Sequence, residues 1–227
     1  MEMYRKIIET ADGSHTLFVP GMDEQYHSVN GAITESEYVF LEKGFRYHQA
    51  VAPNVFEVGF GTGLNALLTA LEAEKMHRKI CYTSIEKYPL AEKEIKALNY
   101  GTQLSACAPK LFEQLHCADW NREVAVSEHF VLHKINADLC TYTFTDEKNF
   151  DIVYFDAFGP DKQPAMWHPE VFQKIFCACN YNAVFVTYSA KGEIRRRLQR
   201  CGFKMERLPG PPGKRQMLRG IKTNFDN

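Results

Sequence analysis

The chain has 227 residues, of which 45% are hydrophobic and 24% are charged, and its formal net charge is −1. These values suit one sizeable α/β domain, with or without an extension, and are ordinary for a globular protein. No stretch is long and apolar enough to cross a bilayer, so we expect no membrane partner. Residues 1–6 lack the apolar core of a secretory signal, which favours a cytoplasmic location.

The 7 cysteines are odd in number and are not spaced as a disulfide framework. Cys177 and Cys179 form the only close pair, and they fall in a segment that reads as helical, where residues two apart point to different sides. A zinc site normally needs two such pairs or added histidines. We therefore expect no metal, and interpret the cysteines as buried or half-buried thiols.

We interpret residues 1–52 as an N-terminal extension. Residues 6–10 and 16–19 flank a glycine-containing turn and predict a β-hairpin. Residues 23–29 and 32–40 are expected to form short helices.

From Pro53 onward, apolar strands alternate with helices, and we assign residues 53–227 to one domain. The expected strands are 54–58, 79–85, 130–135, 150–155 and 183–188, followed by two late strands at 203–208 and 216–221. The expected helices are 64–75, 89–98, 169–179 and 193–201. This alternation predicts an α/β fold with a doubly wound, mostly parallel sheet and an antiparallel pair at one edge. Its ligand should bind beyond the carboxyl ends of the strands, where the strand order reverses.

A glycine-rich turn, E-V-G-F-G-T-G at residues 57–63, lies between the first of these strands and the first helix. Gly59, Gly61 and Gly63 allow a ligand to approach the backbone and the N–H groups that open the next helix. The dinucleotide fingerprint would place its third glycine at position 64, where this chain has Leu64. The spacing therefore argues against NAD or FAD.

Acidic residues follow the next three strands: Glu86, Asp138 and Asp156. A carboxylate at Glu86 is placed to accept the two hydroxyls of a ribose, and one at Asp138 to accept an adenine amine. All three should converge on one crevice, although each is also a candidate cap for the element that follows it. An adenosine without phosphates fits this set, which indicates S-adenosylmethionine.

Several motifs carry a family resemblance. The stretch E-V-G-F-G-T-G-L-N-A at 57–66 resembles the first motif of the class I methyltransferases, which have a Rossmann-like fold. Others are similar to the methyltransferase domain of MnmC-like tRNA modification enzymes: D-G-S-H-T-L at 12–17, D-E-Q-Y-H-S-V-N-G-A at 23–32, I-E-K-Y-P-L at 85–90, F-D-A-F-G-P-D-K-Q-P-A-M-W at 155–167, T-Y-S-A-K-G at 187–192 and P-G-P-P-G-K-R at 209–215.

This resemblance implies methylation of the amine of 5-aminomethyl-2-thiouridine at the tRNA wobble position, giving 5-methylaminomethyl-2-thiouridine. It implies S-adenosyl-L-methionine as cofactor, bound by Glu57, Gly59, Gly61, Gly63, Glu86 and Asp138. Many family members carry a second, FAD-dependent oxidase domain. This chain stops at Asn227, so we expect no FAD, and the oxidase or upstream modification enzymes would be separate chains.

Asp156 is the candidate catalytic residue, because an acceptor amine must lose a proton to attack the methyl group. Many amine and amide methyltransferases of this fold have N-P-P-Y at this point, and the D-A-F-G-P here departs from that pattern. Phe158, Pro160, Met166 and Trp167 are candidates for the wall of a base pocket, with core packing as the alternative for Phe158 and Trp167.

From Thr187 to the end the chain has 11 basic and 3 acidic residues, which points to a polyanionic partner or to a solvated helix face. Tyr188, Lys191, Lys214 and Arg215 follow the fifth strand and the late proline–glycine loop, and we expect the cations to contact tRNA. By resemblance, Tyr26 and His27 approach the substrate pocket, with a structural histidine as the alternative for His27.

Two other classes of function stay open. The stretch Asp23-Glu24-Gln25-Tyr26-His27 is similar to one in spermidine synthase, an aminopropyltransferase, although the basic C-terminal segment argues against a polyamine substrate. A noncatalytic RNA-binding module that retains a nucleoside pocket is the other alternative. A nucleotide-dependent oxidoreductase is disfavoured by Leu64.

Overall fold

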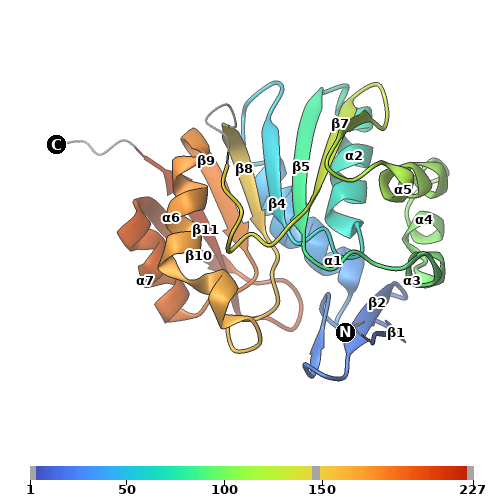
Figure 1. Ribbon diagram of the computed structural model, residues 1–227, viewed down its shortest axis with the longest axis horizontal. Helices are drawn as coiled ribbons and strands as arrows, with labels where there is room; N and C mark the ends of the chain where they lie inside the picture. Colours follow the sequence, from blue (N-terminus) through green and yellow to red (C-terminus); the bar gives the residue numbers. More distant parts are fainter. Residues whose placement is uncertain (1–3, 145–148, 224–227) are drawn as a thin grey trace.

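A central β-sheet organises the molecule (Figure 1). The computed structural model describes residues 4–144 and 149–223. Residues 1–3 lie outside these ranges, and so does Asp226, one of the 3 acidic residues counted from Thr187 to the end. Within the described ranges the sheet has 8 strands in the order β10-β11-β9-β8-β4-β5-β7-β6. Their bounds are β4 Asn54–Val58, β5 Ile80–Glu86, β6 Glu123–Ala125, β7 Phe130–Asn136, β8 Phe150–Phe155, β9 Cys179–Thr187, β10 Phe203–Pro209 and β11 Gln216–Lys222.

The strand directions confirm the predicted doubly wound architecture. Strands β7, β5, β4, β8 and β9 are parallel, while β11 runs antiparallel to β9, and β10 antiparallel to β11. The chain runs outward from β4 through β5 to β7 and then returns to β8, on the other side of β4. This reversal places a ligand-binding crevice at the carboxyl ends of β4 and β8. The short strand β6, which pairs antiparallel with β7, was not predicted.

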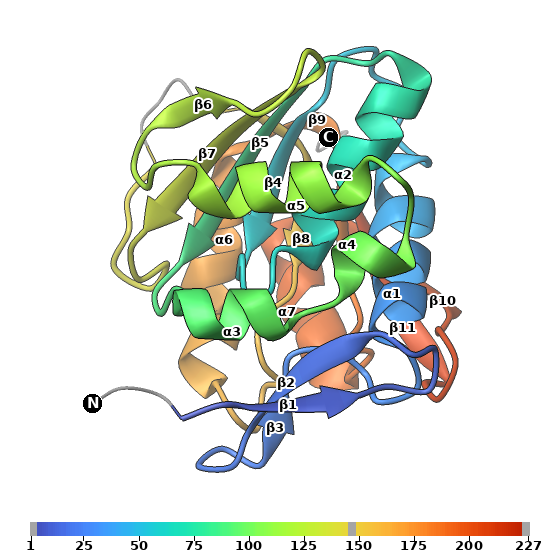
Figure 2. The same cartoon turned by 90° about the vertical axis from the view of Figure 1, so that its right-hand side faces the viewer.

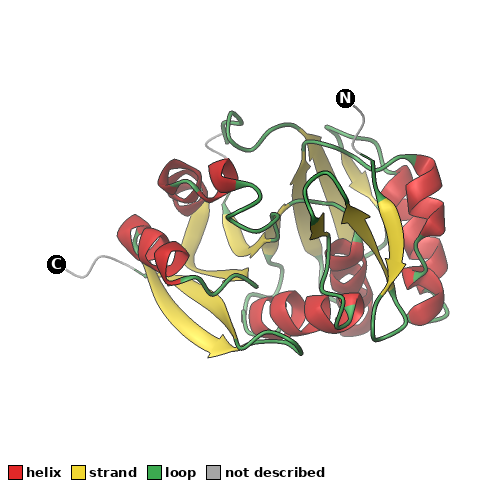
Figure 3. Ribbon diagram, turned by 90° about the horizontal axis from the view of Figure 1, so that it is seen from below, coloured by secondary structure: helices red, strands yellow, loops and turns green. Residues whose placement is uncertain are grey.

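Side chains that alternate along the strands build two apolar layers. On β4, Val55 faces one layer and Phe56 the other; on β8, Tyr154 and Phe155 divide in the same way. The first layer is covered by α2 (Leu64–Met76), α5 (Ala108–Cys117) and the π-helical segment η1 (Glu37–Phe45). The second is covered by α6 (Pro169–Cys177) and α7 (Gly192–Cys201). Figure 3 shows helices on both sides of the strands.

The N-terminal part forms a second, three-stranded sheet of β1 (Lys6–Glu9), β2 (His15–Val19) and β3 (Glu24–Gln25). Figure 2 places it below α3 (Glu92–Ala97) and α4 (Tyr100–Gln103). The hairpin was predicted, but the helix expected at 23–29 is wrong. Glu24 and Gln25 pair with β2 instead, after a turn in which Asp23 has a φ of 49°.

Helix α1 (Ala32–Ser36) continues into η1, and Phe40 and Phe45 of η1 belong to the same apolar cluster as α2. The first 52 residues therefore contribute to the core of the main sheet, and a domain division at residue 52 stays a prediction.

Other boundaries also differ from expectation. The helix expected at 169–179 ends at Cys177, and Cys179 opens β9, so these two cysteines lie on different elements. The helix expected at 89–98 is confined to 92–97, and α4 and α5 were not predicted. A short 3-10 helix, η2 (Pro164–Trp167), precedes α6. Among the described residues, the helices are all too short or too polar to cross a membrane.

Candidate active site

A pocket lies where the carboxyl ends of β4, β5 and β8 meet. Most residues that were expected to bind cofactor or substrate line it: Tyr26, His27, Gly59, Gly61, Glu86, Asp138, Asp156 and Phe158. They come from five separate parts of the chain. The residues from 59 onward converge because parallel strands present their carboxyl ends at one edge of a sheet.

The glycine turn forms one wall of the pocket. Gly59 and Gly61 have φ angles of 89° and 48°, a region that disfavours residues with a side chain. A Cβ on Gly59 would lie 3.1 Å from the Asp156 carbonyl oxygen, and one on Gly61 would lie 3.0 Å from Cδ1 of Tyr26. Gly63 stands at the start of α2 and does not line the pocket.

Glu86 is fixed against this turn. Its Oε2 accepts a hydrogen bond from the Gly61 N–H at 3.1 Å, and its Oε1 accepts one from the Tyr88 N–H at 2.7 Å. Each carboxylate oxygen has a further lone pair, so both remain able to accept a hydroxyl hydrogen. This arrangement fits the ribose of an adenosyl group.

Asp138 also lines the pocket, next to the apolar residues Ala137 and Leu139. Its Oδ1 accepts from the Cys140 N–H at 2.9 Å, and its Oδ2 accepts from Lys87 Nζ at 2.8 Å. The hydrogen bond from Lys87 is the main reason that the pKa of Asp138 is lowered. The apolar flank and the carboxylate edge suit a purine ring with an exocyclic amine.

Asp156 follows β8 and is held by Asn65, whose Nδ2 donates to Asp156 Oδ2 at 2.8 Å. Burial raises the pKa of Asp156 to about 7, with a further contribution from the charge of Glu35. The carboxyl group is therefore divided between its acid and base forms at neutral pH, which suits a general base.

Glu57 is placed differently from its expected role as a cofactor ligand. Its side chain is wholly buried beneath the turn, accepts a hydrogen bond from Ser84 Oγ at 2.6 Å, and does not line the pocket. Burial raises its pKa to about 8, so the carboxyl group is mainly protonated at neutral pH.

Tyr26 and His27 connect the N-terminal sheet to the pocket. The Tyr26 ring packs edge-on against Phe158, with centroids 4.9 Å apart, and its hydroxyl accepts from Arg5 Nε at 2.8 Å. His27 Nε2 lies 2.7 Å from Thr62 Oγ1, and burial lowers its pKa to about 4. His27 is thus a neutral, hydrogen-bonded residue of the pocket wall.

The remaining predicted residues stand outside the pocket lining. Tyr188 donates a hydrogen bond from its hydroxyl to the Ala157 carbonyl oxygen at 2.9 Å. Lys191 pairs with Asp161, Lys214 pairs with Glu35, and Arg215 is exposed. Of the candidate base-pocket residues, Met166 lines the pocket, while Trp167 is fully buried against Phe155 in the core.

Sequence reasoning missed Asn65 and Glu35. Asn65 lines the pocket from the first turn of α2. Its position in the sequence, directly after the glycine turn, was the available clue. Glu35 has no local pattern that distinguishes it, because its partner Lys214 is 179 positions away.

The described residues contain no group of three or more His, Cys, Asp or Glu side chains arranged to hold a metal ion. The doubly wound sheet, the bare glycine turn and the acids at neighbouring strand ends instead define an enzyme that binds an adenosyl cofactor.

Residues 103–223 match the family model described as S-adenosyl-L-methionine-dependent methyltransferase. The chain therefore belongs to the S-adenosyl-L-methionine-dependent methyltransferases, and S-adenosyl-L-methionine is its cofactor. This confirms the expected enzyme class.

More specific relatives are proteins named MnmC. The chain is 30% identical over 223 residues to the tRNA 5-methylaminomethyl-2-thiouridine biosynthesis bifunctional protein MnmC of Paraburkholderia phymatum, covering 90% of the chain and 33% of that protein. The chain spans about a third of the length of the curated relatives it matches. Among solved structures, MNMC2 from Aquifex aeolicus has a TM-score of 0.80 and 25% identity, covering 96% of this chain and 70% of that one. The predicted relationship to MnmC enzymes is confirmed.

Spermidine synthase from Thermotoga maritima is a more distant structural neighbour. Its TM-score is 0.56 at 12% identity, and the match covers 99% of this chain and 73% of that one. At this identity the likeness shows a shared fold and carries nothing about aminopropyl transfer.

Proposed function

We propose that this protein methylates the primary amine of 5-aminomethyl-2-thiouridine at the tRNA wobble position, producing 5-methylaminomethyl-2-thiouridine. The observation that carries the proposal is Asp156, a carboxyl group poised near neutral pH in the same pocket as the glycine turn and Glu86. The names of the relatives, which refer to the biosynthesis of this nucleoside, supply the substrate.

Cofactor binding is assigned to residues that offer matching chemistry. The turn at Gly59 and Gly61 leaves room that a Cβ would fill, and the Glu86 carboxylate faces the pocket beside it. Asp138 and the apolar residues next to it are assigned to the adenine. S-adenosyl-L-methionine supplies an electrophilic methyl group on a sulfonium.

Asp156 is assigned to the acceptor amine. A primary amine is mostly protonated at neutral pH, so it arrives as an ammonium and gives one N–H proton to the carboxylate of Asp156. The freed nitrogen lone pair forms the new N–C bond while the C–S bond breaks and its electron pair stays on sulfur. The product leaves as a secondary ammonium, and the proton on Asp156 passes to water.

Alignment of the two reactants supplies much of the rate. Holding reacting groups in line is worth roughly 7–11 kcal/mol. Asn65 fixes the Asp156 carboxyl, and Phe158, packed edge-on against Tyr26, offers an aromatic face for an extruded base.

Exposed cations of the C-terminal segment are assigned to the tRNA backbone. Lys191, Arg196, Arg200, Arg207 and Arg215 are exposed, on and around α7 and β10. Phosphate contacts of this kind release counterions, so tRNA binding should weaken steeply as salt concentration rises.

The acceptor is tested by incubating the purified protein with radiolabelled S-adenosyl-L-methionine and one of three acceptors. These are tRNA carrying 5-aminomethyl-2-thiouridine, the same tRNA without the aminomethyl group, and putrescine. The proposal predicts label in the first tRNA alone. Label in the unmodified tRNA contradicts it. So does label in putrescine when decarboxylated cofactor, labelled in its aminopropyl group, replaces S-adenosyl-L-methionine.

A further inference from the structure

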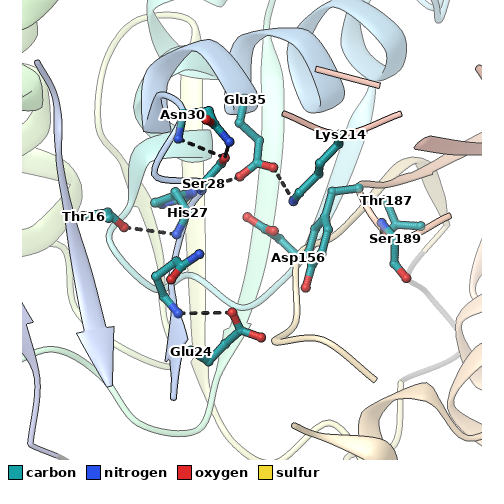
Figure 4. A network of polar contacts seen from close by, with 12 residues as sticks. Thr16, Glu24, His27, Ser28, Asn30, Glu35, Asp156, Thr187, Ser189 and Lys214 are labelled. Carbon is teal, nitrogen blue, oxygen red and sulfur yellow. Dashed lines mark hydrogen bonds and ion pairs between the residues drawn. The ribbon is translucent and has the colours of Figure 1, made fainter. Parts of the chain in front are cut away.

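A partly buried ion pair joins the N-terminal and C-terminal parts of the chain next to the active site. Glu35, in α1, is 5% exposed; its Oε2 accepts from the Ser28 N–H at 2.7 Å, and its Oε1 pairs with the ammonium of Lys214, in the loop between β10 and β11 (Figure 4). The same ammonium lies over the ring of Tyr188, 3.8 Å from its centroid. Lys214 therefore already contacts a carboxylate and an aromatic ring. A lysine that binds a tRNA phosphate would instead be free of such partners.

The backbone around the pair is fixed as well. Gly213 has a φ of 80°, and a Cβ there would lie 2.0 Å from Nδ2 of Asn30. Tyr38 donates a hydrogen bond from its hydroxyl to the Pro209 carbonyl oxygen at 3.1 Å. The late proline–glycine loop is thus packed tightly on residues 28–38, which places the Lys214 ammonium beside the site.

Asp156 faces both charges of this pair. Figure 4 shows its carboxylate turned toward Glu35 and Lys214. Burial is the largest influence on the pKa of Asp156, and beyond it Glu35 raises that pKa while Lys214 lowers it. The other titratable groups that act on or are influenced by Asp156 are Glu57, Tyr82, Tyr100 and Tyr188, all buried or half-buried. None of these four groups is a cation. Among the groups named here, Lys214 therefore supplies the positive charge that offsets the carboxylates of Glu35 and Asp156.

We propose that Lys214, held by Glu35, is a positioning residue for the acceptor: it lets Glu35 and Asp156 be ionised together and leaves the site one net negative charge, which selects a singly charged ammonium. This inference rests on the proposed function, because it explains the negative charge of the site by the positive charge of the aminomethyl group that the site would bind. Without Lys214, the charge of Glu35 would act on Asp156 unopposed and favour the protonated form of the base.

The charge count also suits the reaction. An ammonium enters, one proton moves from nitrogen to Asp156, and a secondary ammonium of the same charge leaves. A site with one negative charge therefore matches substrate and product equally.

The test uses three variants of the full chain. Lys214→Met keeps the aliphatic stem over Tyr188, Glu35→Gln keeps an oxygen for the Ser28 N–H, and the double variant removes both charges. The affinity for S-adenosyl-L-methionine is measured by calorimetry from pH 5.5 to about 9, with neutral S-adenosylhomocysteine as the control ligand. Because a sulfonium binds better when Asp156 is ionised, the midpoint of this pH dependence reports the ionisation of Asp156 without RNA.

We expect Lys214→Met to raise the midpoint by about one pH unit, Glu35→Gln to lower it by a similar amount, and the double variant to restore it. The pH profile of single-turnover methyl transfer to aminomethyl tRNA should shift in parallel. If the pair had only a structural role, the variants would have a lower thermal unfolding temperature and an unchanged midpoint of the pH dependence of cofactor affinity. That result would overturn the inference. Expected midpoint shifts without methyl transfer by the wild type would support the role of the pair and contradict only the acceptor proposed above.

Discussion

Asn65 Nδ2 donates a hydrogen bond to Asp156 Oδ2 at 2.8 Å, linking the first turn of α2 to the end of β8. This bond lowers the pKa of Asp156 and so opposes the effect of burial, which raises it to about 7. The amide therefore keeps a usable fraction of the base form at neutral pH.

Replacing this donor should shift the pH profile of the reaction. Asn65→Leu has a similar volume and no hydrogen bond to give, so the pKa of Asp156 rises and the acid limb of the single-turnover rate should move up by about one pH unit. The rate at high pH should recover toward that of the wild type. An unchanged acid limb would show that Asn65 does not act on Asp156.

Asp156 itself should affect turnover far more than cofactor binding. Asp156→Asn keeps the shape but loses the negative charge and the proton acceptor, so turnover should fall by about 10²–10⁴-fold. The affinity for S-adenosyl-L-methionine, measured by calorimetry, should stay within about an order of magnitude of the wild type. Wild-type turnover in this variant would remove Asp156 from its assigned role as base.

The wild-type rate should depend on pH with a definite sign. The pKa of Asp156 is raised to about 7, so the carboxyl group is protonated below that pH and the base form is lost. The rate constant for methyl transfer should therefore fall by about tenfold for each pH unit below the midpoint, and level off above it. A profile that stays flat from pH 5.5 to about 8 is incompatible with this assignment.

Glu86 should contribute to cofactor affinity. Glu86→Ala removes the ribose acceptor and the bond that fixes the Gly61 N–H, and we expect the dissociation constant for S-adenosyl-L-methionine to rise by about 10–100-fold. The matched control is Glu92→Ala, an exposed glutamate at the start of α3, which should bind like the wild type. Equal affinities for the two variants would place the ribose elsewhere.

Asp12 should stabilise the N-terminal region. Its Oδ2 accepts from the Thr34 N–H at 2.9 Å in α1, and its Oδ1 accepts from the Ser14 N–H at 3.1 Å. Burial opposes ionisation, but hydrogen bonds from Ser14, Thr34 and Thr10 outweigh it and lower the pKa of Asp12. The stabilisation is therefore present at neutral pH and is lost as the pH falls below about 4, the value for an unfolded chain.

Asp12→Ala should lower the free energy of unfolding by about 2 kcal/mol at pH 7 in urea titrations. Asp119→Ala serves as the control, because its exposed side chain lies 3.8 Å from Arg122 and should contribute within about 0.5 kcal/mol of zero. A loss no larger for Asp12 than for Asp119 would count against this role.

Local patterns were enough to predict the parallel sheet and the pocket at its edge. The spacing of Gly59, Gly61 and Gly63, with acids after successive strands, is a short-range pattern, and parallel strands bring such positions together. Helix α4 was missed because its 4 residues are too few to show a helical period, and β3 was taken for a helix because 2 residues are too few to show alternation.

Long-range pairs lay beyond sequence reasoning. Lys214 resembled any other cation of the basic C-terminal segment, and only the packing of its loop on residues 28–38 shows that it belongs to the ion pair with Glu35. The orientation of Glu57 was also beyond the sequence pattern. Its place in the motif suggests a contact with the cofactor, whereas the strand orientation turns its side chain into the interior.

The most direct test of the central claim is the identity of the methylated nucleoside. Wild-type protein is incubated with methyl-deuterated S-adenosyl-L-methionine and tRNA carrying 5-aminomethyl-2-thiouridine, and the digested nucleosides are analysed by mass spectrometry. Our account predicts one deuterated methyl group on the side-chain nitrogen of the wobble uridine. Deuterium on any other nucleoside, or its absence from all of them under conditions where calorimetry shows the cofactor bound, would contradict it.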